Sequence, residues 1–271
     1  MYNVGKKLMK GEKNMPALKE ICDYLDDLLE INRFPHDPSN NGLQFQGVNE
    51  VHKAVFAVDA SEAVFNIAAD MDADFIFTHH GISWGNGFKR LTGPTANRIK
   101  ALAANGISLY AAHLPLDAHE MIGHNALLGD MLNLKDVEKF GSYHDYQIGI
   151  KGTLPKAMSL KEMSELFNEA LPSEGDFAGL GDFSRKIKHV AIISGGGAWP
   201  ELFDEIAESD VEALITGEFT HEIWHPALES GTSVLGLGHY RSETPGVIAV
   251  MSAIREQFQI ETEFIDIPTG L

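Results

Sequence analysis

Three predicted strands of this 271-residue chain each end directly in histidine. These histidines are the pair His79 and His80, then His113, and then His239. Two of the three strand ends add a carboxylate four residues further on, at Asp117 and Glu243. Because the carboxyl ends of parallel strands form the ligand-binding edge of α/β sheets, we expect these side chains to converge in space.

The local geometry of these residues sets two conditions. Adjacent strand residues point to opposite faces, so His79 and His80 reach one site only if the strand stops there and the chain turns. Gly81 permits such a turn. His239 and Glu243 are spaced i, i+4, so a helical turn that begins at His239 would place both on one face.

Imidazole and carboxylate groups in this number indicate a metal site. The spacing supplies five candidate ligands, with His113 as a sixth: His79, His80, Asp117, His239 and Glu243. Two closed tetrahedral sites would need eight donor positions, so a bridging carboxylate and water would complete a pair of ions and leave open positions of the catalytic kind. Nitrogen and oxygen donors suit zinc, iron or manganese, with nickel as a further option, and disfavour copper(I). The alternative is a set of separate structural or surface histidines.

The composition excludes several classes of function. Lys and Arg number 21 against 39 Asp and Glu, a formal net charge of −18, so broad nucleic-acid binding is not expected. The single cysteine, Cys22, excludes a disulfide framework and a Cys-rich metal site, and it favours the reducing cytosol. No segment approaches the roughly 18 apolar residues of a membrane span, and the Lys-rich start lacks a signal-peptide core. We therefore expect a cytoplasmic protein without membrane contact.

The first half of the chain is typical of a βαβαβ unit. An amphipathic helix at 17–31 and a loop rich in Pro, Asn and Gly at 33–47 come first. The expected strands follow at 54–58, 75–78 and 107–112, with helices between them. His36 and Asp37 fall in the loop and are expected at the surface.

The second half repeats this order, with strands expected at 190–193, 213–216 and 233–237. We predict an α/β fold of two similar lobes with mostly parallel sheets facing a shared inter-lobe cleft. The expected division is a flexible extension at 1–15 and one unit at 16–271. Its lobes span about 16–130 and 190–271, joined by a strand and a helix at about 131–189. Chance similarity of two generic βαβ units is the alternative.

Three further features of the second half could face the cleft. Residues 216–218 correspond to 78–80, which directs Glu218 toward the site, with helix capping as the alternative. The Ser-Gly-Gly-Gly segment at 194–197 could bind a phosphate through its N–H groups or could serve as a tight turn. Trp199 could stack on a heterocycle or simply pack.

Together these blocks resemble the Nif-three-like dinuclear-metal proteins, which are also called GTP cyclohydrolase I type 2 homologues. The blocks are NGLQ at 41–44, THHGISW at 78–84, HLPLD at 113–117, GHN at 123–125, SGGGA at 194–198, and GHYRSE at 238–243 with Gly246. The similarity runs from about residue 18 to 267 and matches the short form without an inserted middle domain. His124 departs from the family pattern and is expected to be either a polar wall of the cleft or a solvated side chain.

The resemblance implies two α/β lobes, a ring-shaped homohexamer and a two-metal centre whose ligands are the five residues given above. It also implies that His113 orients Asp117 or handles a proton. We expect a metal-dependent hydrolase with His113 and Glu218 as candidate catalytic residues, acting on a nucleotide-like or phosphoester small molecule. A GTP-like substrate rests on the family label alone. The alternatives are a non-catalytic carrier of metal or metallocofactor, and an adaptor whose ring matters more than its metals.

Overall fold

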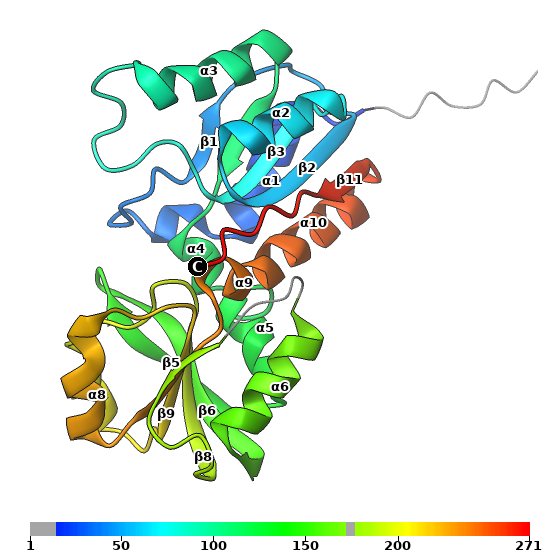
Figure 1. Ribbon diagram of the computed structural model, residues 1–271. Helices are drawn as coiled ribbons and strands as arrows, with labels where there is room; N and C mark the ends of the chain where they lie inside the picture. Colours follow the sequence, from blue (N-terminus) through cyan, green and yellow to red (C-terminus); the bar gives the residue numbers. More distant parts are fainter. Residues whose placement is uncertain (1–14, 172–176) are drawn as a thin grey trace, which may run out of the picture.

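The computed structural model describes residues 15–171 and 177–271 and shows two lobes, one above the other in Figure 1. Each lobe is a β-sheet with helices on both faces, so the predicted α/β class is confirmed. Within the described residues, no helix is long and apolar enough to cross a membrane. The predicted extension at 1–15 lies outside the described residues except for Met15, which packs against the core of the first lobe.

The first lobe contains a five-stranded sheet of order β1-β4-β3-β2-β11. Its strands are β1 (Gly42–Phe45), β2 (Lys53–Asp59), β3 (Phe75–His80), β4 (Ser108–Ala111) and β11 (Glu261–Phe264). All neighbours pair in parallel except β1, which runs antiparallel to β4 at one edge. The carboxyl ends of β2, β3 and β4 therefore lie at the same edge of the sheet.

Both faces of this sheet are covered by helices. They are α1 (Leu18–Leu28), α2 (Glu62–Asp70), α3 (Gly93–Asn105) and α10 (Thr244–Phe258). Helices α1 and α10 pack on one face, where Ile21 and Val250 meet Phe56. Helices α2 and α3 pack on the other face, where Phe65 meets Ile76. Because both faces of β2 are covered in this way, its apolar run is continuous.

The second lobe contains a six-stranded sheet of order β5-β6-β8-β9-β10-β7. Its strands are β5 (Lys135–Tyr143), β6 (Tyr146–Met158), β7 (Ala178–Leu180), β8 (Ile187–Ile193), β9 (Ala213–Thr216) and β10 (Ser233–Gly236). The central strands β8, β9 and β10 are parallel, and the outer strands join them in antiparallel pairs.

Helices also cover both faces of the second sheet. They are α5 (His124–Met131), α6 (Leu160–Ala170), α7 (Leu202–Ala207) and α8 (Trp224–Ser230). Figure 1 shows α6 and α8 on opposite sides of the sheet. Two very short helices, α4 (Leu114–Asp117) and α9 (His239–Ser242), lie at the junction of the lobes. The series β8-α7-β9-α8-β10 thus has the same order as β2-α2-β3-α3-β4.

The sheets divide the chain differently from the predicted lobe boundaries. The segment 131–189 supplies β5, β6 and β7 to the second sheet instead of standing between the lobes. The C-terminal β11 returns to the first sheet, where Thr262 pairs with Ala54. The predicted loop at 33–47 contains β1, an edge strand of four residues whose two apolar side chains, Leu43 and Phe45, make too short a pattern to predict a strand.

Candidate metal centre

The histidines and carboxylates predicted from the strand ends meet at the junction of the lobes. His79 and His80 are the last two residues of β3, so the strand stops where the prediction required. Asp117 ends α4, and His239 begins α9, the helical turn expected from its spacing to Glu243. The candidate ligands form three groups, and within each group the ligand atoms lie within 4.8 Å of one another. The groups are His79, His80 and His113; His79, Asp117 and His124; and His80, His239 and Glu243.

The Glu243 carboxylate lies at the middle of this cluster. Its Oε1 atom is 3.5 Å from Nε2 of His79 and 3.2 Å from Nε2 of His239. Its Oε2 atom is 3.6 Å from Nε2 of His80. Asp117 also contacts the cluster, with Oδ2 3.8 Å from Nε2 of His79. Two carboxylates and three imidazole Nε2 atoms therefore face one small volume.

Each of these imidazoles is held by its other nitrogen. Nδ1 of His80 lies 2.9 Å from Asp59, Nδ1 of His239 lies 2.9 Å from Glu218, and Nδ1 of His79 lies 3.0 Å from the carbonyl of Ala112. Carboxylates and carbonyls only accept hydrogen bonds, so each Nδ1 carries the proton. The Nε2 atoms consequently face the cluster, which is the arrangement that orients histidines for metal binding.

Buried polar atoms without partners test whether the cluster fits a cation. Nε2 of His79 and Oε2 of Glu243 are buried, and neither has a hydrogen-bond partner among the described residues. Leaving such atoms unpaired is costly, and both are electron-pair donors. A divalent cation among the nitrogen and oxygen donors would satisfy both, so the residues present fit a metal ion such as zinc, iron or manganese.

The electrostatics of the cluster also favour a bound cation. Burial alone would raise the pKa of Glu243, but the imidazoles of His80 and His79 and the hydrogen bond from His239 hold it well below its usual range. Burial lowers the pKa of His239, yet Glu243 and Glu218 outweigh this and raise it to about 10. Burial raises the pKa of Asp117. The buried carboxylates thus require positive charge beside them.

His113 contacts the site from its rim. Its Nδ1 lies 2.8 Å from Oδ1 of Asp37, and the pKa of His113 is raised because the contacts with Asp37 and Asp117 outweigh burial. The Asp37 side chain is fully buried, which makes the expected surface position of this residue wrong. Asp37 also accepts the N–H of Leu114 and the side-chain amide of Asn41, so it closes the loop onto the start of α4.

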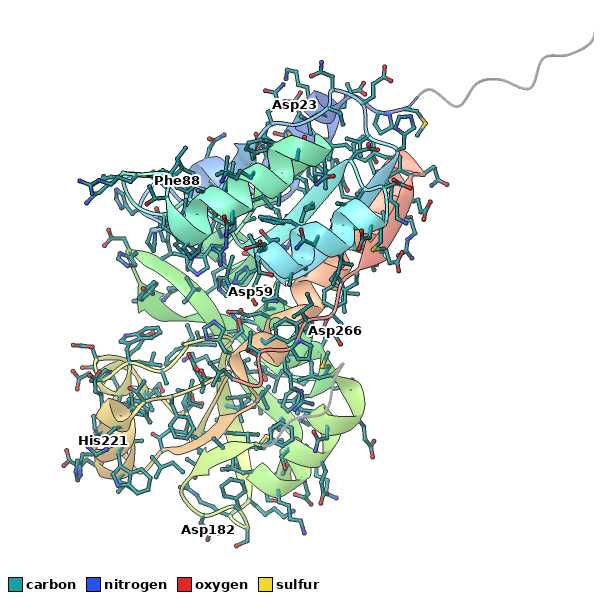
Figure 2. The ribbon with its side chains drawn as sticks, turned by 45° about the horizontal axis from the view of Figure 1, so that its top comes forward. Asp23, Asp59, Phe88, Asp182, His221 and Asp266 are labelled. Atoms are coloured by element: carbon teal, nitrogen blue, oxygen red, sulfur yellow. The ribbon has the colours of Figure 1, made fainter. Side chains whose placement is uncertain are left out.

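Sequence reasoning missed Asp37 and Asp59 because their partners lie far away along the chain, 76 and 21 residues respectively. Figure 2 places Asp59 near the junction of the lobes, whereas His221 lies at the outer side of the second lobe. A signal for Asp59 was available: it ends the apolar strand β2, next to the strand that ends in His80.

The glycine-rich segment after β8 forms part of the same site. A Cβ atom on Gly195 would overlap the Glu243 carboxylate, so this position requires glycine. The Ser194 hydroxyl donates to Oδ1 of Asp117 at 3.1 Å. The sequence suggested phosphate binding or a tight turn for this segment. The structure shows in addition that it lies in close contact with the carboxylates of Glu243 and Asp117.

An open cavity of about 370 Å³ borders the cluster. Its polar wall includes His80, His113, Asp117, His239, Glu243 and Ser194. The lining also includes Tyr143 and Trp199, whose ring centroids are 5.5 Å apart. The cavity is therefore lined both by the clustered donor atoms and by aromatic rings.

Comparison with known proteins identifies the family. A family model described as Duf34/NIF3 (NGG1p interacting factor 3) matches residues 16–270. The chain belongs to the Duf34/NIF3 family. The predicted resemblance is thereby confirmed.

Other Duf34/NIF3-like proteins are similar over nearly the whole chain. Curated relatives from Pyrococcus horikoshii and Archaeoglobus fulgidus, both named GTP cyclohydrolase 1 type 2 homolog, are each 42% identical. The alignments cover 93% and 94% of this chain and 98% and 99% of those proteins. A solved structure from Thermus thermophilus is 35% identical with a TM-score of 0.81, and protein ybgI, of unknown function, is 31% identical with a TM-score of 0.85. Both comparisons cover 94% of this chain and 100% of the solved one.

Proposed function

We propose that this Duf34/NIF3 protein binds two divalent transition-metal ions and acts as a metal-dependent hydrolase. The proposed ligands are His79, His80, Asp117, His239 and Glu243. The observation that carries the proposal is the common orientation of the imidazoles, whose Nδ1 atoms are occupied while Nε2 faces the buried carboxylates. Zinc, iron or manganese matches these donors.

The arrangement of donors supports two ions instead of one. His79 and Asp117 belong to one candidate group, and His80 and His239 belong to another. Glu243 lies between them, with one oxygen near His79 and the other near His80. A carboxylate in this position can serve both groups. The set provides fewer donors than two closed sites need, so positions remain for water and substrate.

Hydrolysis requires an activated water and a path for protons. Divalent ions bound here would act as Lewis acids. They would lower the pKa of a bound water and polarise the substrate group that this water attacks. His113 lines the cavity with its Nδ1 held by Asp37, so its Nε2 can exchange a proton with a bound molecule. Glu218 is half-exposed and contacts His239, where it can pass a proton to solvent.

The substrate class follows from the cavity and from the relatives. A volume of about 370 Å³ lined in part by Tyr143 and Trp199 suits a small molecule with a planar ring. The relatives' name, GTP cyclohydrolase 1 type 2 homolog, points to nucleotides. We propose a nucleotide-like or phosphoester metabolite, whose negative charge the ions would offset on an acidic protein.

A panel of nucleotides and phosphoesters, assayed with zinc-, iron- and manganese-loaded protein, tests this function. We expect repeated turnover on at least one compound, abolished in Asp117→Ala and kept in the exposed control Asp130→Ala. Exchange of metal with a chelator and no turnover on any compound would contradict hydrolysis and favour the carrier function.

We further propose a homohexamer in the cytosol. The family resemblance supports the ring, and the single cysteine supports a reducing compartment. Light scattering coupled to size exclusion should give six times the 29.7 kDa chain mass, and a monomer mass would contradict the ring.

A further inference from the structure

His124 is the first residue of α5, and its imidazole caps a different helix. The first N–H groups of a helix have no acceptor within it. At the start of α10, Pro245 has no N–H to offer, and the N-cap residue Glu243 provides no side-chain cap. The N–H of Gly246 donates instead to Nδ1 of His124, at 3.1 Å and across 122 residues.

The approach of His124 depends on glycine at position 246. A Cβ atom there would lie 2.7 Å from Nδ1 of His124 and 2.8 Å from its Cε1 atom. Real side chains do not reach such distances, so another residue would push the ring away. The contact between His124 and the start of α10 therefore requires glycine at position 246.

This cap fixes the position of the ring proton. A nitrogen that accepts a hydrogen bond presents its lone pair, so Nδ1 of His124 carries no proton. The proton of the neutral ring is then on Nε2. Turning the ring over would place a carbon against the N–H of Gly246 and leave that buried donor without an acceptor. His124 is thus the reverse of His79, His80 and His239, which carry their protons on Nδ1.

The imidazole of His124 belongs to the cluster of candidate metal ligands. His124 is fully buried and stands edge-on to His79, with ring centroids 4.6 Å apart. His79, Asp117 and His124 bring candidate ligand atoms within 4.8 Å of one another. Nε2 of His124 is buried without a hydrogen-bond partner among the described residues.

We propose that His124 is not a metal ligand but a fixed N–H donor, and that its Nε2–H binds an oxygen acceptor held at the centre of the site. A protonated nitrogen cannot coordinate a cation, whereas it can donate to an oxygen of a water or of an anionic substrate. The inference rests on the proposed two-metal centre and adds a binding group for substrate oxygen. The expectation that His124 is solvated is wrong, because its side chain is fully buried.

Nitrogen NMR of the histidine rings reads the proton position directly. We expect the signals lost in His124→Asn to belong to an Nε2–H ring in wild-type protein, both metal-free and loaded with zinc. A proton on Nδ1, or loss of the Nε2 proton on zinc loading, would overturn the proposal. The measurement needs no turnover, so absence of hydrolase activity would leave it standing.

Two isosteric variants separate the two nitrogens. His124→Asn keeps an acceptor near the Nδ1 position and removes the Nε2 donor, whereas His124→Gln keeps a donor near the Nε2 position and removes the cap. We expect both to bind as much zinc per chain as wild type. We expect inorganic phosphate, titrated into the zinc-loaded protein, to bind about tenfold more weakly to His124→Asn and at wild-type strength to His124→Gln.

The thermal midpoints should show the opposite order, with His124→Gln below His124→Asn because α10 loses its cap. Loss of zinc in His124→Asn would show that the ring is a metal ligand. Equal phosphate affinity in wild type, His124→Asn and His124→Gln would show that Nε2–H of His124 does not donate to the bound anion. If His124→Gln does not fold, the wild-type NMR result and the zinc and phosphate measurements on His124→Asn still decide the proposal.

Discussion

Glu218 and His239 come from different elements of the second lobe, and the Glu218 carboxylate lies 2.9 Å from Nδ1 of His239. Glu218 follows β9, the strand that corresponds to β3 in the first lobe. His239 begins α9 after β10. The carboxylate therefore fixes the ring so that Nε2 meets Glu243 at 3.2 Å. In the first lobe, Asp59 holds His80 in the same way.

The Glu218→Gln substitution should weaken zinc binding. Loss of a carboxylate behind a metal-binding imidazole reduces metal affinity by about 10- to 100-fold, because the ring is less well oriented and less basic. Competition with a chromophoric chelator measures the change. The exposed Glu222→Gln serves as the matched control and should bind zinc like wild type. Equal affinity in both variants would show that Glu218 does not support the site.

Asn125 connects the lobe junction to the second sheet. Its side-chain amide donates to the carbonyls of Asp117 and Ile148 and accepts the N–H of Ser194. Asn125→Ala leaves these buried groups unpaired and should destabilise the protein by about 2–4 kcal/mol. Urea unfolding measures the loss. Asn66→Ala, on an exposed face of α2, should stay within about 0.5 kcal/mol of wild type, and an equally small effect at Asn125 would contradict this account.

Cys22 should react slowly with thiol reagents. Burial first, then the charges of Asp26 and Asp23, raise the pKa of this thiol to about 12. Since the thiolate is the reactive form, modification at pH 8 should be at least about tenfold slower in the folded protein than in urea. Absorbance of a disulfide reagent follows the reaction. Equal rates before and after unfolding would contradict the burial of Cys22.

Glu162 should contribute a stabilisation that disappears in acid. The hydrogen bond from Lys186, followed by those from Ser159, lowers the pKa of Glu162 from 4.5 to about 2. A carboxyl group whose pKa is lowered by folding stabilises the protein above its unfolded pKa, and this effect is lost as the pH falls through its folded pKa. The thermal midpoint of Glu162→Gln should thus lie below wild type at pH 6.

The difference between Glu162→Gln and wild type should narrow as the pH falls from about 4.5 to 2. Glu165→Gln, on the same helix, is the control, since Glu165 has only a 3.9 Å contact with Lys161. A difference in thermal midpoint between Glu162→Gln and wild type that stays constant down to pH 2 would show that the ion pair with Lys186 does not stabilise the protein.

The central strands of both lobes could be predicted from sequence because burial on both faces leaves a continuous apolar run. The run 54–58 became β2, and 190–193 falls within β8. The edge strands gave no such signal. β5 is mostly exposed and polar, and β1 has four residues in a segment rich in Gly and Asn. Their pairing depends on neighbouring strands and not on their own composition.

The site could be predicted only in part. Spacing brought His239 and Glu243 together because four residues make one helical turn. Spacing could not find Asp37, which is buried by the fold although it lies in a polar loop. His124 was noticed in the sequence, but the direction of its two nitrogens depends on Gly246 at the start of a helix 122 residues away.

The most direct test of the two-metal proposal is elemental analysis of protein purified without added metal. The proposal predicts about two transition-metal equivalents per chain, falling sharply in Glu243→Ala because that carboxylate lies between both groups of donors. Less than about half an equivalent in every wild-type preparation, with no increase after incubation with zinc, iron or manganese, would contradict it.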